Sequence, residues 1–174
     1  RGNAKKALRD YNGAIEDYNK SIELNPAYLQ SYFNRASVKM EQKNYEGALA
    51  DYSRVLEIDP QNFRAYYGRG NIKIARRDYE GASAEYSKAI ASNPDYAEAY
   101  QNRGNVRMIQ EKYGESVADY NEVLRLTPQN AGAYFNRARS RWLGSDKNGA
   151  CADWRRSFEL GAKEAAAIMQ QNCR

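Results

Sequence analysis

The sequence repeats itself every 34 residues, and this period limits the folds open to the chain more than any other feature. All four prolines follow it: Pro26, Pro60, Pro94 and Pro128. Five further columns keep the same spacing with no insertion: Arg1, Arg35, Arg69, Arg103 and Arg137; Gly2, Ala36, Gly70, Gly104 and Ala138; Tyr11, Tyr45, Tyr79 and Tyr113; Tyr18, Tyr52, Tyr86, Tyr120 and Trp154; and Tyr32, Tyr66, Tyr100 and Tyr134. A period of this length predicts a stack of small, similar units in place of one globular core.

Each unit is predicted to contain two helices. In the unit from 29 to 62, residues 28–42 contain good helix formers and no proline, and residues 45–58 form a second helical stretch. Proline cannot continue a helix interior, so Pro60 marks the end of the second helix. The small residue Ala36 indicates a close approach of two helices. The three aromatic columns hold 12 of the 15 tyrosines, so packing explains the tyrosine excess.

The pattern within a unit resembles the tetratricopeptide repeat. The resemblance rests on the period of 34, the small residue Ala36, the Tyr45 and Ala48 pair, the aromatic Tyr52 and the closing Pro60. It covers essentially the whole chain. The recurring Asn-Arg-Ala and Asn-Arg-Gly strings are similar to those of many bacterial members of the family.

This resemblance implies an all-α fold, a right-handed superhelical solenoid of antiparallel helix hairpins with a C-terminal capping helix. It also implies boundaries within a single domain, 1–174: a partial repeat, 1–28; full repeats, 29–62, 63–96 and 97–130; a divergent terminal repeat, 131–164; and a capping helix, 162–173. The capping helix is expected to cover Trp154 and Phe158. The first unit lacks counterparts of residues 29–34, so we expect its end to be open, either to preceding repeats or to a partner.

Charged columns predict a ladder of ion pairs between the two helices of each unit. The Arg35 column has an acidic counterpart on the second helix: Asp17, Asp51, Glu85, Asp119 and Asp153. Guanidinium binds carboxylate through two parallel hydrogen bonds, which suits a partly buried pair. We expect these pairs to set helix register more than to add stability. The net charge of +5 (27 basic residues minus 22 acidic ones) is then weak evidence for nucleic acid.

The composition excludes several kinds of chemistry. The chain has no histidine, which removes Ser-His and Cys-His nucleophiles and histidine-ligated metals. It contains no glycine-rich phosphate loop, and no apolar run approaches the roughly 20 residues of a membrane-spanning helix. We therefore predict that the chain is not an enzyme and holds no metal or cofactor.

Two cysteines leave two alternatives open. Cys151 stands in the column of Ile15, Leu49 and Val117, where a free thiol would act as a small buried hydrophobe. Antiparallel helices on either side of Gly161 would instead bring it to Cys173. A disulfide would indicate an oxidising compartment such as a periplasm, so the compartment stays open between cytoplasm and periplasm.

The candidate binding residues lie on the first helices, opposite the Arg35 and Lys39 columns. In a stack of such hairpins the first helices line the concave wall. Their side chains are rich in rings, amides and methionine, which suits a groove that reads an extended peptide backbone. The candidate residues are Phe33, Asn34, Ser37, Met40, Arg64, Tyr67, Asn71, Ile74, Gln101, Asn102, Asn105, Met108, Phe135, Asn136, Arg139 and Trp142.

The leading hypothesis is a scaffold that binds a peptide or helix of a partner protein in this groove. A second hypothesis is binding of single-stranded RNA or another polyanion, as some helical repeats do. The groove offers only Arg64 and Arg139 as cations, against Glu41 and Glu98, and a polyanion needs a basic track. A third hypothesis is self-association into homo-oligomers through the open N-terminal end.

Overall fold

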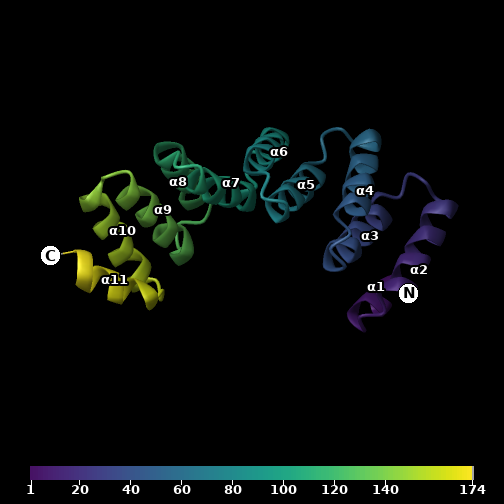
Figure 1. Ribbon diagram of the computed structural model, residues 1–174, viewed down its shortest axis with the longest axis horizontal. Coiled ribbons are helices and arrows are strands. Elements are labelled where there is room, and N and C mark those ends of the chain that lie inside the picture. The colour runs from purple at the N-terminus through teal and green to yellow at the C-terminus, as the bar shows by residue number, and fades with distance from the viewer. Residues whose placement is uncertain (174) are drawn as a thin grey trace. The chain divides into compact units, whose positions relative to one another are not determined.

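The computed structural model describes residues 1–173, which form helices joined by short turns (Figure 1). The helices are α1 (Gly2–Ala7), α2 (Tyr11–Leu24), α3 (Leu29–Glu41), α4 (Tyr45–Ile58), α5 (Phe63–Ala75), α6 (Tyr79–Ser92), α7 (Ala97–Ile109), α8 (Tyr113–Leu126), α9 (Ala131–Leu143), α10 (Lys147–Glu159) and α11 (Glu164–Asn172). No strand occurs among the described residues, and none of the helices formed by them has the length and apolar character needed to cross a bilayer.

Two compact units divide the chain. The first spans Arg1–Ser92 and holds α1 to α6, and the second begins at Asn93 and holds α7 to α11. In the first unit, contacts join each pair α1–α2, α3–α4 and α5–α6, and the α2–α3 and α4–α5 contacts stack these pairs. The second unit repeats the scheme with α7–α8 and α9–α10, and α11 packs on α10. The predicted all-helical stack of hairpins is confirmed within each unit, whereas the repeat boundaries stay a prediction.

The turn inside each hairpin follows one backbone scheme. After α3 the Lys43 N–H donates to the Met40 carbonyl and the Asn44 N–H donates to the Lys39 carbonyl. This pair of bonds is the Schellman ending of a helix, which needs a left-handed residue at its centre. Lys43 supplies that residue with a φ of 58°. In the turns of the other four hairpins, the left-handed position is occupied by Arg9, Arg77, Glu111 and Ser145, all with positive φ.

Small residues on the first helices let the rings of the second helices approach closely. A Cβ added at Gly70 would lie 2.5 Å from the Tyr86 ring, and one added at Gly68 would collide with the Tyr52 ring. Ala36, in the Gly70 column, is fully buried. Gly70 and Tyr86 therefore pack within one hairpin, whereas Gly68 and Tyr52 pack between successive hairpins.

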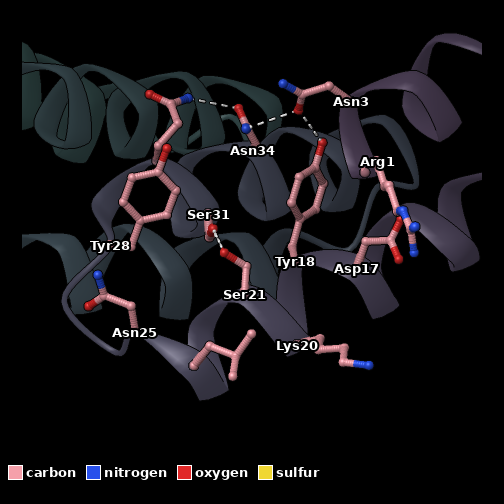
Figure 2. Close-up of a pocket in the computed structure, with 13 residues that line it drawn as sticks. Arg1, Asn3, Asp17, Tyr18, Lys20, Ser21, Asn25, Tyr28, Ser31 and Asn34 are labelled. Carbon is pink, nitrogen blue, oxygen red and sulfur yellow. Dashed lines mark hydrogen bonds between the residues drawn. The ribbon is translucent and has the colours of Figure 1, made fainter.

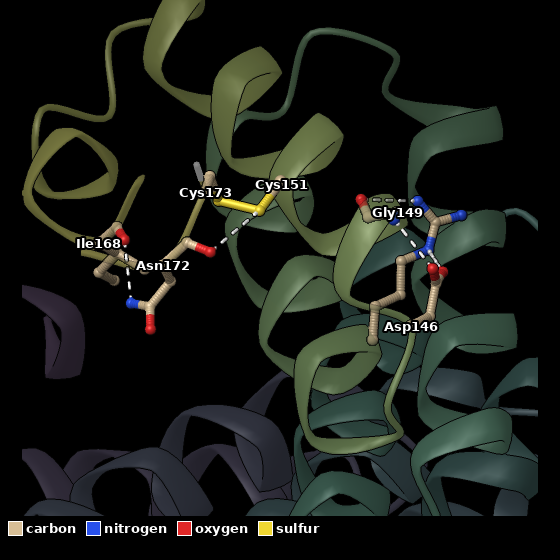
Figure 3. Close-up of a disulfide and its surroundings, with 7 residues drawn as sticks. Asp146, Gly149, Cys151, Ile168, Asn172 and Cys173 are labelled. Carbon is tan, nitrogen blue, oxygen red and sulfur yellow. Dashed lines mark hydrogen bonds and ion pairs between the residues drawn. A yellow bond between two sulfur atoms is a disulfide. The ribbon is translucent and has the colours of Figure 1, made fainter. Parts of the chain in front are cut away.

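Helix α11 closes the second unit against α10. Ala165 is fully buried and Trp154 is 3% exposed, and Met169 packs against the same core cluster. A disulfide joins Cys151 on α10 to Cys173, which directly follows α11 (Figure 3). The expectation that this helix also covers Phe158 is wrong, because that ring keeps 45% of its surface exposed.

Candidate functional site

The ladder of ion pairs lies between the two helices of each hairpin. The Arg35 guanidinium donates from Nε and Nη2 to the Asp51 carboxylate, and Lys39 donates to the same carboxylate over 2.8 Å. Arg103 with Asp119 and Arg137 with Asp153 repeat this arrangement. Arg69 with Glu85 is a fourth pair. The predicted ladder is confirmed in these four hairpins.

The first hairpin departs from the ladder. Asp17 forms its ion pair with Lys5, at 3.1 Å between Nζ and Oδ2. The described residues show no ion pair between Arg1 and Asp17. Asp17 also keeps 25% of its side chain exposed, whereas Asp51 keeps 3%. The predicted Arg1–Asp17 pair is therefore wrong, and Lys5 takes the place of Arg1 as the partner of a half-buried Asp17.

Tyrosines of the second helices reach through to asparagines on the first helices. Three such pairs recur, each with the phenolic hydroxyl donating to Oδ1: Tyr18 to Asn3 at 2.7 Å, Tyr86 to Asn71 at 2.7 Å and Tyr120 to Asn105 at 2.5 Å. An amide whose oxygen accepts such a bond is held in one orientation, with its NH₂ group turned the other way. The tyrosines thus orient asparagines of the candidate face, a role that the residue pattern alone did not indicate.

Burial further favours the protonated form of two of these hydroxyls. The Tyr120 side chain is fully buried, and this burial raises its pKa above the ordinary value for tyrosine. Burial likewise raises the pKa of Tyr18. Both hydroxyls are therefore neutral donors throughout the physiological pH range.

The aromatic candidate residues are not free on the surface. In the first unit the Phe33 ring lies edge-on to Tyr52 with centroids 5.8 Å apart, and Tyr67 lies 5.7 Å from Tyr86. In the second unit Trp142 lies 5.5 Å from Trp154. Each ring therefore takes part in the packing of its own hairpin as well as lying on the candidate face.

The remaining candidates of the first unit differ in their surroundings. Asn34 accepts from Gln30 and donates to Asn3, while Ser37 accepts from Lys6. Met40 packs against the core, Ile74 is half-buried and Arg64 is exposed. Asn34 is therefore tied to the Tyr18–Asn3 pair, and the two asparagines form one hydrogen-bonded group.

In the second unit the candidates again divide into packed and accessible side chains. Phe135 packs against the last core cluster, and Lys147 places its ammonium 3.7 Å from the Trp142 ring centroid. The half-buried candidates here are Gln101, Asn102, Asn105, Met108 and Asn136, and Arg139 is exposed. Each unit thus carries its own part of the candidate face.

An open pocket of about 730 Å³ lies at the start of the first unit (Figure 2). It is lined by α1, α2 and α3, with Tyr18, Leu24, Tyr28, Ser31 and Asn34 among its residues. Of these residues, only Asn34 is among the candidate binding residues predicted from the sequence. Within residues 1–173, no group of three or more cysteine, aspartate or glutamate side chains is placed to hold a metal ion.

Comparison with solved structures shows the same fold in several proteins. The structure of MamA matches with a TM-score of 0.84, 21% identity and coverage of 95% of this chain and 96% of that chain. YrrB, described as a TPR protein with an unusual peptide-binding site, matches with a TM-score of 0.79, 16% identity and coverage of 98% and 88%. PilF of Pseudomonas aeruginosa matches with a TM-score of 0.79, 18% identity and coverage of 92% and 73%. No curated protein matches the sequence.

A family model described as the TPR repeat matches the sequence in four overlapping segments. They cover residues 2–43, 36–75, 70–109 and 104–143. These matches extend over most of the chain and agree with the 34-residue columns and the stacked hairpins. The chain belongs to the tetratricopeptide repeat (TPR) family.

Proposed function

We propose that this protein is a non-enzymatic scaffold that binds a peptide segment of a partner protein on the faces of its first helices. The TPR fold in general supports a role in protein–protein interaction. The peptide-binding site of YrrB gives a precedent within the same fold. The proposal for this chain rests on its own side chains.

The observation that carries the proposal is the Tyr120–Asn105 hydrogen bond. Tyr120 is fully buried, and its hydroxyl donates to Oδ1 of Asn105 over 2.5 Å. No described residue accepts a hydrogen bond from the Asn105 NH₂ group. A half-buried amide fixed in this way offers its NH₂ group to a backbone carbonyl without the entropic cost of first finding its orientation.

The distribution of cations favours a peptide over a polyanion. Arg35, Arg103 and Arg137 are each held by a buried aspartate, so they are not available to phosphates. A polyanion would need a track of free cations along the face. We expect homopolymer RNA to bind this protein weakly, without the steep salt dependence of a dedicated site.

The experiment begins with random peptides displayed on phage and selected on the wild-type protein. Synthetic copies of the selected peptides are then titrated against Asn105→Leu, which keeps the bulk and removes the amide. We expect affinity to fall about tenfold, because one hydrogen bond to a half-buried group is lost. Tyr120→Phe should lower it by a smaller factor, since the amide remains but loses its fixed orientation.

The matched control is Gly114→Ala in the same unit. An added Cβ there meets nothing within 4 Å, so this variant should fold normally and bind every selected peptide as the wild type does. Equal binding of the peptides to Asn105→Leu and to the wild type would refute the proposed site.

A further inference from the structure

The candidate face of the second unit ends in two exposed apolar side chains. Ile109 is the last residue of α7 and Leu143 the last residue of α9, and they keep 54% and 50% of their surface exposed. Asn105 lies one turn before Ile109 on the same side of α7, so the apolar side chains continue the face that carries this amide. In the first unit the same column holds smaller or charged residues: Ala7, Glu41 and Ala75.

Arg139 adds an unpaired positive charge to the same face. It stands in the 34-residue column of Asn105 and is exposed on α9. Within residues 1–173 it forms no hydrogen bond and no ion pair. Its neighbours Arg137 and Arg141, in contrast, both bind the buried Asp153. Arg139 therefore keeps its charge available to a ligand.

The Arg139 guanidinium lies near the hydroxyl that orients Asn105. Burial raises the pKa of Tyr120, and the positive charge of Arg139 lowers it to a smaller extent. Such an electrostatic effect falls off with distance, so the cation and the oriented amide belong to one site. The amide suits a backbone carbonyl of a ligand, whereas the guanidinium suits a carboxylate.

The acidic residues of α7 and α9 do not offset this charge. The two helices contain a single acid, Glu98. It lies nearly two turns before Asn105, at the opposite end of α7 from Ile109. The end of the face that holds Arg139 therefore attracts an acidic side chain, and a large apolar side chain beside it can remove the exposed Ile109 from water.

Given a peptide-binding role of this face, we propose that the second unit recognises a partner segment with an acidic side chain, bound by Arg139, next to large apolar side chains, packed on Ile109 and Leu143. The Asn105 amide reads only the backbone, so it contributes affinity while these three side chains set the sequence preference. In the first unit the position of Arg139 is taken by neutral residues: Asn3, Ser37 and Asn71.

The test selects phage-displayed random peptides in parallel on the wild type, on Arg139→Glu and on Arg155→Glu. Arg155 is the matched control, because it is an exposed arginine on α10 of the same unit and its reversal changes the net charge equally. We expect acidic residues to be enriched in the wild-type and Arg155→Glu pools, and basic residues in the Arg139→Glu pool. Synthetic acidic peptides should bind Arg139→Glu about tenfold more weakly than the wild type, since an attraction becomes a repulsion.

A second arm tests the apolar contact. The double variant Ile109→Ser and Leu143→Ser should bind the selected peptides about tenfold more weakly, because apolar surface is no longer buried. Serine in place of the large apolar residue of each peptide should weaken its binding to the wild type by a similar factor. Phe158→Ser is the control, since this ring is 45% exposed on α10 of the same unit, and it should leave binding unchanged.

The outcomes separate this proposal from the peptide-binding role on which it rests. Peptides that lose affinity for Asn105→Leu but bind Arg139→Glu as tightly as the wild type would support that role and overturn the sequence preference. Pools without acidic or apolar enrichment would overturn it too. An equal loss of affinity for Arg139→Glu and Arg155→Glu would assign the effect to net charge alone and would also overturn the proposal.

Discussion

Arg69 holds Glu85 through a single hydrogen bond, 3.1 Å from Nη2 to Oε1. The equivalent Arg103 donates to both oxygens of Asp119. Glu85 is one methylene longer, and as a result Arg69 Nε and Glu85 Oε2 are buried with no hydrogen-bond partner. Lys73 is the counterpart of Lys39, which binds Asp51 in its own hairpin. Lys73 instead binds Asp78, at 2.8 Å. This hairpin therefore carries two unsatisfied buried groups.

We predict that Glu85→Asp stabilises the protein by about 1–2 kcal/mol, because it lets two buried polar groups find partners. Urea unfolding followed by circular dichroism measures the change. The reciprocal change Asp119→Glu should destabilise the α7–α8 hairpin by a similar amount. A lower midpoint for Glu85→Asp than for the wild type would show that the longer side chain is the better fit.

The helix-ending turns predict a second pair of substitutions with opposite effects on stability. Lys43 has a φ of 58° and Gly161 a φ of 103°, and each lies at the centre of a Schellman ending. We expect Lys43→Gly to stabilise the protein by up to about 1 kcal/mol and Gly161→Ala to destabilise it by about 1 kcal/mol. Space is not at issue at Gly161, because an added Cβ meets nothing within 4 Å. Thermal unfolding that gave both changes the same sign would contradict this explanation.

The disulfide should stabilise the second unit. It links residues 22 apart in the sequence, and closing a loop of this length restricts the unfolded chain by an amount equivalent to about 3 kcal/mol. Reduction with dithiothreitol is expected to lower the unfolding midpoint of the wild type. The midpoint of Cys173→Ala should equal that of the reduced wild type and should not change when reductant is added. A wild-type midpoint that is the same with and without reductant would argue against the bond.

Alkaline pH should reveal the burial of Tyr120. Its pKa in the folded protein lies above the ordinary value near 10, chiefly because burial disfavours the phenolate. Its contribution to stability is therefore complete below pH 10 and declines as the pH rises above that value. We predict that Tyr120→Phe reduces the loss of stability above pH 10 by up to about 1.4 kcal/mol per pH unit. Parallel pH profiles for the variant and the wild type would refute this prediction.

The sequence predicted the fold more completely than the site. Columns such as Ala36 and Tyr52 recur in register, and the proline stop at Pro60 helped to place the second helix at 45–58, as the structure has it. The candidate site was harder to predict. A residue's place in a repeat column predicts on which side of the helix its side chain lies, but not how deeply that side chain is buried. Phe33 was assigned to a binding face, yet its ring packs on Tyr52.

The sequence by itself determined the repeat, the helix pairs and the partners of four arginines, because these follow from spacing and charge within one unit. Only the tertiary structure decided how members of one column differ. Leu24 and Ile58 stand in the same column, but one is exposed and the other packs against a core. The Asn105 amide is oriented by a hydrogen bond that its oxygen accepts from the Tyr120 hydroxyl on another helix. Burial and hydrogen bonding depend on contacts with neighbouring helices. The spacing of residues within one unit does not predict these contacts.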